Sequence, residues 1–279
     1  MEPIRRAIWY IEAHFASPIG LAEIAEASQL SRFHFSRCFA QSTGLSVSAY
    51  LRGRRLTEAA RQLSKGAPNI LSVALGVGYG SHEAFTRAFG DLFGVTPEEV
   101  RSRSSVENLP LLDPYIMNQS GTHLPQPEIY ELGPFLLAGI REFRTYEERV
   151  AIPGQWQRFA PYLGNVPGQR GRDAYGVCLA PSCGEEGFDY LTAVAVRSLD
   201  ELPEGLCGVR IARRRYATFR HDEHVSKIGA TCAAIFGEWQ PKAGVELANE
   251  PLFLIEHYGP GFDPVTGQGG MAVWVPLKD

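Results

Sequence analysis

Apolar residues in the first hundred positions recur at helical spacing. Ile4, Ile8, Ile11 and Phe15 follow one another at intervals of three or four residues, which places them on one face of an amphipathic helix. From about residue 129 the pattern changes to short apolar runs, such as 252–258 and 271–276, set among many glycines and prolines. Such runs are typical of β-strands. The sequence therefore predicts two domains, an all-α head and an α+β body.

The body shows the same order of elements twice. We expect helices near 152–163 and 224–239, and strands near 129–144, 174–179, 187–196, 208–220, 252–258 and 270–276. That order is strand, helix, strand, strand, and then the same again. It predicts a fold built from two βαββ repeats.

A polar stretch that contains prolines, residues 101–115, separates the helical pattern of the head from the strand pattern of the body. We expect a head over residues 1–105, a linker over 106–122 and a body over 123–279. A boundary nearer Thr122 is the alternative. The 279 residues fit two domains of ordinary size.

The net charge of −4 conceals an uneven distribution. The head carries 12 lysines and arginines against 9 acidic residues, or +3, and the rest of the chain carries 15 against 22, or −7. The start of the chain lacks the apolar segment of an export signal, and no apolar run is long enough to span a membrane. Scattered cysteines without metal-binding spacing indicate reduced thiols. We expect a cytoplasmic protein without membrane partner, metal or cofactor.

The head contains a repeat at an offset of 50 residues. The segment from Ser31 to Phe39, followed by Gly44, matches the segment from Ser81 to Phe89, followed by Gly94. Each copy has a serine suited to a helix N-cap and a glycine suited to the helix end. A short helical stretch and a tight turn precede each copy, at 21–27 and 70–75. This order predicts two helix-turn-helix motifs.

Each repeated helix has a largely polar face opposite its inward phenylalanines, which are Phe35 and Phe39 in the first copy and Phe85 and Phe89 in the second. The candidate DNA-binding residues on the polar face are Arg32, Phe33, Ser36 and Arg37 in the first copy, and His82, Glu83, Thr86 and Arg87 in the second. In a major groove, arginine can bond guanine, an aromatic ring can contact a thymine methyl group, and a carboxylate can accept from cytosine. An ordinary solvated helix surface is the alternative.

The connecting helix, expected over 46–65, sets the distance between the two motifs. Its 20 residues span about 30 Å, close to the ~34 Å between successive major-groove faces. We therefore expect a monomer to place both recognition helices on one duplex. Candidate phosphate contacts on this helix are Arg52, Arg54, Arg55 and Arg61.

The stretch from Ala74 to Arg101, with Gly78-Tyr-Gly-Ser-His-Glu-Ala-Phe85, Arg87, Phe89 and Gly94-Val-Thr-Pro97, resembles the signature of the AraC/XylS transcription regulators. The resemblance covers residues 3–103 and implies a regulator that binds promoter DNA. Arg37 and Arg87 match monomeric members whose head is also N-terminal. Those members carry Trp and Gln where this chain has Phe33 and Ser36, and Gln where it has His82 and Glu83.

The body resembles the GyrI-like domain over roughly 125–279, in segments 188–193, 213–221, 236–239, 253–258 and 272–277. The resemblance implies two pseudo-symmetric halves around a cleft for amphipathic or cationic organic molecules. Candidate ligand contacts are Trp156, Tyr190 and Trp274, with core packing as the alternative. The family often has Glu where this chain has Ala272. Glu256 is a candidate replacement, and an exposed strand carboxylate is its alternative.

The two modules together predict a transcription regulator in which a small effector changes access to DNA or to RNA polymerase. The alternative is a GyrI-like hydrolase or sequestering protein fused to a DNA-binding head. No catalytic residue is assigned. Asp222 lies in a polar turn with His221, Glu223 and His224, without the HExxH spacing of a metal site. Neither Cys178 nor Cys183 lies in a nucleophile motif.

Overall fold

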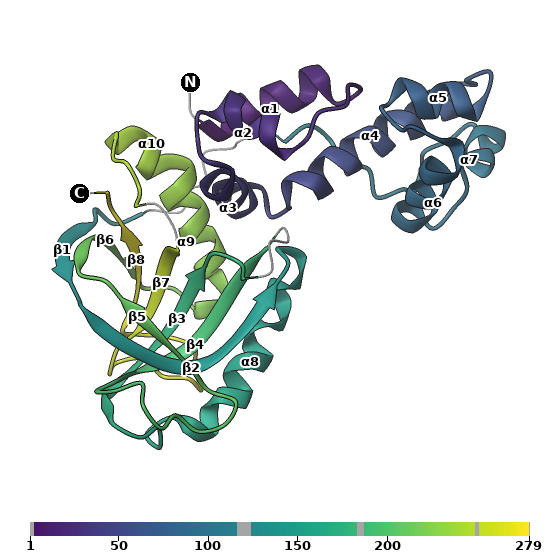
Figure 1. Cartoon of the computed structure of the whole chain (residues 1–279). Coiled ribbons are helices and arrows are strands. Elements are labelled where there is room, and N and C mark those ends of the chain that lie inside the picture. The colour runs from purple at the N-terminus through teal and green to yellow at the C-terminus, as the bar shows by residue number, and fades with distance from the viewer. Residues whose placement is uncertain (1–2, 116–123, 183–186, 249–250, 279) are drawn as a thin grey trace. The chain divides into compact units, whose positions relative to one another are not determined.

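The computed structural model describes residues 3–115, 124–182, 187–248 and 251–278 (Figure 1). The chain divides into two compact units. One comprises Met1–Ser36 and Val47–Asn118, and the other comprises Arg37–Ser46 and Gln119–Asp279. Each unit is described by itself. The predicted domain limits at 105 and 122 stay predictions, and Thr122 lies outside the described residues.

The first region of the chain is helical, as its apolar spacing predicts. Its helices are α1 (Pro3–His14), α2 (Leu21–Ser28), α3 (Arg32–Thr43), α4 (Val47–Ser64), α5 (Ile70–Gly76), α6 (His82–Phe93) and α7 (Pro97–Arg103). The connecting helix α4 has 18 residues, against the 20 expected. The side chains of Asn69, Ser81 and Thr96 cap α5, α6 and α7 by accepting backbone N–H groups, which fixes where these helices begin.

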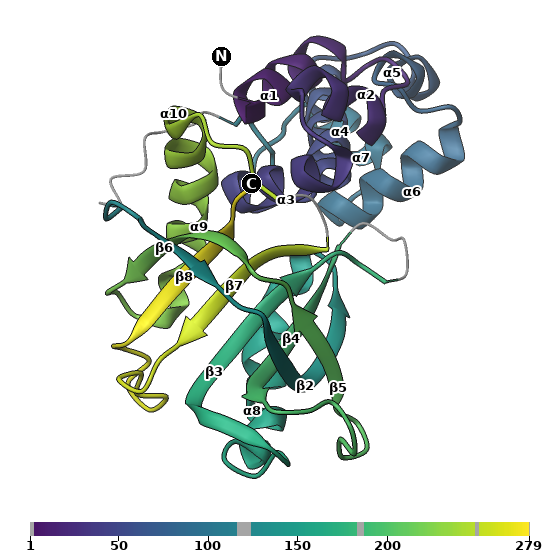
Figure 2. The same cartoon turned by 60° about the vertical axis from the view of Figure 1, so that its left-hand side comes forward.

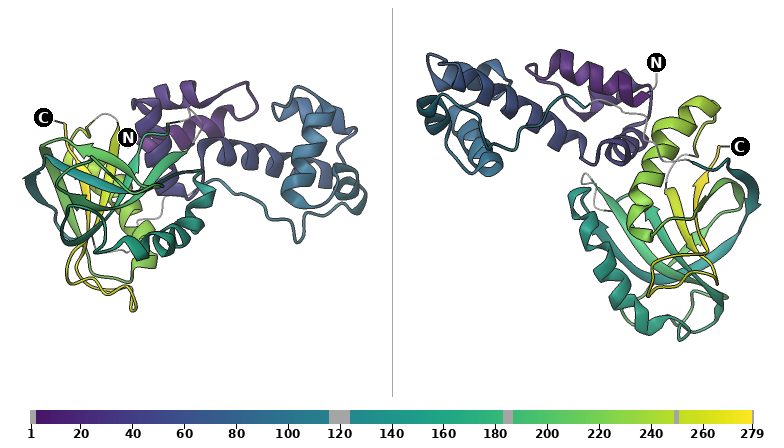
Figure 3. Two further views of the ribbon diagram at one scale, coloured as in Figure 1. Left: turned by 60° about the horizontal axis from the view of Figure 1, so that its bottom comes forward. Right: turned by 180° about the vertical axis from the view of Figure 1, so that it is seen from behind.

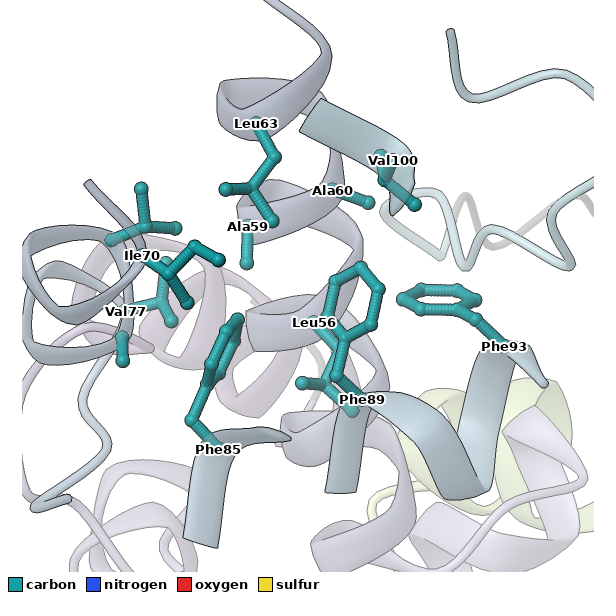
Figure 4. Close-up of a cluster of buried hydrophobic side chains, with 12 residues drawn as sticks. Leu56, Ala59, Ala60, Leu63, Ile70, Val77, Phe85, Phe89, Phe93 and Val100 are labelled. Carbon is teal, nitrogen blue, oxygen red and sulfur yellow. The ribbon is translucent and has the colours of Figure 1, made fainter. Parts of the chain in front are cut away.

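A core of apolar side chains joins α4 to the second helix-turn-helix motif (Figure 4). Phe85, Phe89 and Phe93 lie on one face of α6, and successive rings have centroids 5.5 and 4.7 Å apart. They pack against Leu56 and other apolar residues of α4. Because this face of α6 is locked into the core, its opposite face is directed away from it.

The segment after α7 packs back onto α4. Val106, Leu109 and Leu111 are partly buried against the same core. The Leu112 amide donates to Thr57 Oγ1 at 2.9 Å, and the Tyr115 amide donates to the Tyr50 hydroxyl at 2.9 Å. Residues 106–115 of the predicted linker are therefore held by the helical unit, and 116–122 lie outside the described residues.

The second unit contains one antiparallel sheet of eight strands (Figure 2). Its strands are β1 (Glu128–Leu132), β2 (Phe135–Arg144), β3 (Gln169–Leu179), β4 (Phe188–Val196), β5 (Cys207–Ile211), β6 (Arg214–His221), β7 (Leu252–Tyr258) and β8 (Met271–Pro276). The order across the sheet is β1-β6-β8-β7-β3-β4-β2-β5. This order is symmetric about the β7–β3 pair, which confirms the predicted duplication.

Two of the predicted strands are each divided. The run expected at 129–144 forms β1 and β2, and the run expected at 208–220 forms β5 and β6. The break after β1 lies at Gly133, whose φ is +90° and which lies close to the Ala212 carbonyl in the second break. β1 pairs with β6, and β5 pairs with β2. Each half of the domain therefore contributes a short strand to the other half.

Helices cover one face of this sheet (Figure 3). They are α8 (Ile152–Phe159), followed by a 3₁₀ turn (Ala160–Tyr162), and a second helical segment. That segment runs through a 3₁₀ turn (Val225–Lys227), α9 (Ile228–Ala234), a π-helical turn (Ile235–Trp239) and α10 (Gln240–Ala243). Phe159 packs on Val194, and Phe219 contacts Trp239 with ring centroids 4.8 Å apart. None of the helices in the described ranges combines the length and apolar content needed to cross a membrane.

Candidate DNA-binding helices and effector site

The second predicted recognition helix corresponds to α6, which presents a polar face at its N-terminal end. Ser81 caps the helix by accepting from the Ala84 amide at 3.2 Å, and Gly94 ends it with a left-handed φ of 68°. His82, Glu83 and Arg87 are exposed, and Thr86 is half-buried. The Glu83 carboxylate interacts with its own backbone amide and with the Ser81 side chain, which lowers its pKa. All four predicted residues therefore lie together, with Glu83 ionised beside the cap.

The first predicted recognition helix corresponds to α3, and two of its candidate residues are not where the prediction puts them. Arg32 is exposed and Phe33 is half-buried, whereas Ser36 and Arg37 are buried. Arg37 belongs to the second unit, where its Nη2 donates to the Leu179 carbonyl at 2.9 Å. Its guanidinium carbon lies 4.6 Å from the centroid of the Phe253 ring. The expected solvent-facing position of Ser36 and Arg37 is wrong for this structure.

The prediction misplaces Ser36 and Arg37 because helical periodicity distinguishes the two faces of α3 but does not show what each face contacts. Arg149 adds to the contacts of the segment 37–46, because its guanidinium donates to the carbonyls of Ala40 and Gly44, each at 3.3 Å. Burial lowers the pKa of Arg37, and nearby Cys178 and Tyr146 partly offset this effect.

Three of the four arginines predicted on α4 as phosphate contacts already have partners within the protein, and Arg52 is the fourth. Arg54 is buried and bonds Glu12 through Nε and Nη2, so it does not fit the predicted phosphate contact. Arg55 donates to the backbone carbonyls of Phe15 and Ser17, and Arg61 pairs with Asp113. Arg52 is exposed and has no recorded partner among the described residues.

A buried carboxylate lies between the sheet and α8. Glu256 on β7 accepts from the Tyr190 hydroxyl at 2.5 Å and from the Tyr258 hydroxyl at 2.9 Å. Trp156 on α8 donates its indole N–H to the Tyr190 oxygen at 3.1 Å. The Trp156 and Tyr258 rings meet edge to face with centroids 5.0 Å apart. Three of the four predicted ligand residues are therefore in one hydrogen-bonded group, together with Tyr258, which the sequence reasoning missed.

Desolvation determines the electrostatics of this group. Burial raises the pKa of Glu256, although the two tyrosine hydroxyls oppose the shift by bonding the carboxylate. Burial and the nearby Glu256 carboxylate raise the pKa of Tyr190 and Tyr258, so both hydroxyls stay protonated. Gly176 faces Glu256 across the β3–β7 pair, and a Cβ there would lie 2.6 Å from Glu256 Oε2. Only glycine leaves room for the network.

Trp274 lies on the other face of the sheet. It pairs with Ile255 in the β7–β8 register, whereas Glu256 pairs with Val273. Its ring stacks on His257, with centroids 4.5 Å apart. The structure therefore separates Trp274 from the other three predicted ligand residues. Ala272 pairs with His257 on the face of Trp274, so Glu256 does not replace a carboxylate at position 272.

The histidine and cysteine residues considered above as reactive or metal-binding groups lie in surroundings that do not favour those roles. His221 is buried and bonds Thr231 and the His224 carbonyl. Burial raises the pKa of the Cys178 thiol to about 12, and Cys183 lies outside the described residues. Within the described ranges, no three His, Cys, Asp or Glu side chains are grouped to hold a metal ion.

Two family models match adjoining parts of the chain. A helix-turn-helix domain model matches residues 24–103, and the model of the integron-associated effector binding protein matches residues 128–277. The chain belongs to the family of integron-associated effector binding proteins. Its head is an AraC-type DNA-binding domain, so this member of the family is a DNA-binding transcription regulator with a C-terminal effector-binding domain.

The chain is similar to one known protein over nearly its whole length and to others over one part of it. The transcriptional regulator Rob of Salmonella typhimurium is 27% identical over 277 residues, which cover 95% of this chain and 92% of Rob. The multiple antibiotic resistance protein MarA of Escherichia coli is 36% identical over 92 residues, or 33% of this chain and 72% of MarA. The structure of SAV2435 bound to tetraphenylphosphonium has a TM-score of 0.45 and 17% identity, covering 55% of this chain and 94% of that one.

Proposed function

We propose that this regulator reads DNA with the exposed face of α6, together with Arg32 and Phe33 of α3. The observation that carries this proposal is the locked orientation of α6. Its phenylalanines are held in the core, so His82 and Arg87 are directed away from it near the helix N-terminus. Recognition helices contact base edges through such N-terminal residues.

An electrophoretic mobility shift tests this half of the proposal. Duplexes are first selected from a random pool with the wild-type chain at fixed salt, because the salt concentration dominates such affinities. Arg87→Ala should weaken binding by about 1–3 kcal/mol. The matched control is Arg220→Ala, which removes an exposed arginine from β6. Equal binding by the Arg87 variant and the control would show that α6 does not read the bases.

We propose that the effector is an amphipathic organic cation that takes the carboxylate of Glu256 as its counter-ion. The support is a buried carboxylate bonded by two neutral hydroxyls and bordered by the Trp156 ring. A cation restores to this carboxylate the charge compensation that burial removes, and the aromatic rings add cation–π attraction. Trp274, on the other face, is outside this site.

Calorimetry of the full chain with tetraphenylphosphonium, and with neutral triphenylphosphine oxide as the matched probe, tests this assignment. The cation should bind more tightly than the neutral probe, and Glu256→Gln should remove the preference. Trp274→Phe should leave both affinities unchanged. A preference that survives Glu256→Gln but disappears in Trp274→Phe would place the cation on the other face of the sheet.

We propose that effector binding acts on DNA binding through Arg37. This side chain rests on Leu179 and Phe253, at the ends of the strands β3 and β7 that also carry Gly176 and Glu256. To contact a base, the Arg37 guanidinium has to leave these partners. An effector that breaks the hydrogen bonds of Glu256 to Tyr190 and Tyr258 shifts these strands. The shift weakens the contacts of Arg37 with Leu179 and Phe253.

Two matched variants test this coupling. Phe253→Ala removes the ring under Arg37 and should tighten DNA binding in the absence of effector. Phe236→Ala removes the other half of the Phe236–Phe253 stack, whose centroids are 4.6 Å apart, without removing the Arg37 contact. If the two variants change DNA affinity equally, the effect reflects lost packing and not release of Arg37.

The partners and location follow from the same proposal. We propose that the chain acts as a monomer on promoter DNA in the cytoplasm, with RNA polymerase as its further partner. α4 supports the monomer, because its 18 residues extend about 27 Å between the two motifs. We propose no catalytic step. Turnover of a bound cation in the calorimeter would instead favour the hydrolase alternative.

A further inference from the structure

We propose that the helical unit carries a second small-molecule site, for an amphipathic carboxylate, in a cavity bounded by α2, α4 and the turn before α6. The cavity has a volume of about 290 Å³, just below the ~300–1,000 Å³ of typical ligand sites, so it fits only a small ligand. All of its lining residues belong to the first compact unit. It is therefore distinct from the effector site at Glu256.

The walls of this cavity are largely apolar. The apolar side chains that line it are Ile19, Leu21, Ile24, Val47 and Leu51. Ile24 and Val47 are buried, and Ile19 and Leu21 are half-buried. A surface of this kind favours a short acyl chain or a single ring, because burying such a group removes apolar area from water.

The polar lining is cationic. Arg52 and Arg55 both line the cavity, and Tyr79 lies with them. Arg55 is occupied by the carbonyls of Phe15 and Ser17, whereas Arg52 is exposed and has no recorded partner among the described residues. Burial raises the pKa of Tyr79, so its hydroxyl stays a neutral donor. An arginine that is free to pair, next to a hydroxyl donor, favours a carboxylate.

One acidic group lies close to the opening. Glu23 accepts from the Gly20 amide at 3.0 Å, and Gly20 is itself part of the lining. Its charge is therefore partly engaged by the backbone at the start of α2. The charged side chains that line the cavity itself are Arg52 and Arg55, so its lining carries positive charge.

The position of the cavity connects it to DNA binding. Gly78, in the turn of the second motif, has a φ of +86°, and a Cβ there would lie 3.0 Å from the Ala16 carbonyl and 3.2 Å from the Arg55 guanidinium. The second motif therefore packs closely against the loop between α1 and α2. A ligand between α2, α4 and Tyr79 contacts both motifs, and so acts on the angle between the two recognition helices.

A phosphate of bound DNA is the competing ligand for Arg52. Phosphate contacts use charge and leave apolar walls empty, whereas this cavity places five apolar side chains beside the arginine. The apolar walls favour a small amphipathic molecule. The experiment below separates the two sources of negative charge.

The test is calorimetry of the full chain without DNA, using octanoate and the neutral octanamide as probes. Octanoate should bind more tightly than octanamide by about fivefold, the order expected for one partly exposed charge pair. Arg52→Gln, at an exposed position, should remove this difference. Ser48→Phe fills the cavity at its exposed rim and should abolish binding of both probes, with circular dichroism confirming that it folds.

Glu256→Gln separates this site from the proposed effector site and should leave octanoate binding unchanged. Loss of octanoate binding in Glu256→Gln, or its survival in Ser48→Phe, would overturn the proposal. So would the absence of binding to the wild-type chain. If Arg52→Gln weakens DNA binding while octanoate and octanamide bind the wild type equally, Arg52 is a phosphate contact and the carboxylate site is refuted.

Discussion

The ion pair between Glu12 and Arg54 connects α1 to α4, and its removal has a large predicted effect. The Arg54 side chain is 5% exposed and that of Glu12 is 22% exposed. Arg54 donates Nε to Glu12 Oε1 at 2.8 Å, Nη2 to Oε2 at 2.8 Å, and Nη1 to the Leu112 carbonyl at 2.7 Å. Tyr50 also donates to Glu12 at 2.8 Å. Glu12 therefore compensates one buried cation and one buried hydroxyl.

Glu12→Ala leaves the Arg54 guanidinium buried with two of its three bonding nitrogens unpaired. Breaking a buried pair from one side costs about 3–5 kcal/mol. Because water reaches part of Glu12, we expect about 3 kcal/mol of lost stability in the helical unit. The matched control is Glu98→Ala, whose pair with Arg101 is exposed and contributes at most about 1 kcal/mol.

Hydrogen exchange of α1 and α4 peptides in increasing urea measures this loss locally, because a chain with two units need not unfold in one step. A second variant tests the reasoning itself. Replacing both partners, as Glu12→Leu with Arg54→Met, removes the unpaired charge and should recover much of the stability. The reasoning is refuted if Glu12→Ala costs no more than Glu98→Ala, or if the double variant is less stable than Glu12→Ala.

Three further predictions concern single sites. Gly176→Ala should cost about 1–3 kcal/mol by overpacking, measured by urea unfolding, and should abolish tetraphenylphosphonium binding, because its Cβ collides with Tyr190 and Glu256. The folded pKa of Glu256 is raised, so its stabilising contribution is full below the unfolded pKa and is lost as pH rises through the folded pKa. As the pH rises through that window, the wild type should therefore lose stability relative to Glu256→Gln, and its affinity for the cation should rise. If the urea unfolding midpoints of wild type and Glu256→Gln keep the same difference at every pH, this reasoning is contradicted. Thr96→Ala removes the cap bond to the Glu99 amide and should destabilise α7 by about 1 kcal/mol, whereas Thr96→Ser should not.

The local features of the helical region could be predicted from the sequence. The 50-residue offset between Ser31 and Ser81 recurs in the structure, since α3 begins at Arg32 and α6 begins at His82. Gly44 and Gly94 both adopt positive φ, at 80° and 68°. These signals are readable because capping and left-handed helix ends depend on residues only a few positions apart.

The same locality explains the errors in the candidate sites. Alternation along one strand shows which of its residues share a face, but not which residue of the next strand lies opposite. The register that pairs Ile255 with Trp274 separates Trp274 from Glu256, and a shift of one residue would have put them together. In the same way, the spacing of Phe35 and Phe39 gives α3 two faces without showing that Arg37 meets Leu179.

The sequence by itself determined the division into a helical and an α+β module, the duplicated helix-turn-helix motif and the two βαββ repeats, and it named Trp156, Tyr190 and Glu256 as candidates without showing that they meet. These follow from periodicity, capping and motif order, which are properties of short segments. Only the tertiary structure decided that β1 and β5 exchange between the halves, that Arg37 is buried, and that a cavity lies beside Arg52. Each of these depends on contacts between residues far apart in the chain, and no local pattern encodes which distant surface a side chain will meet.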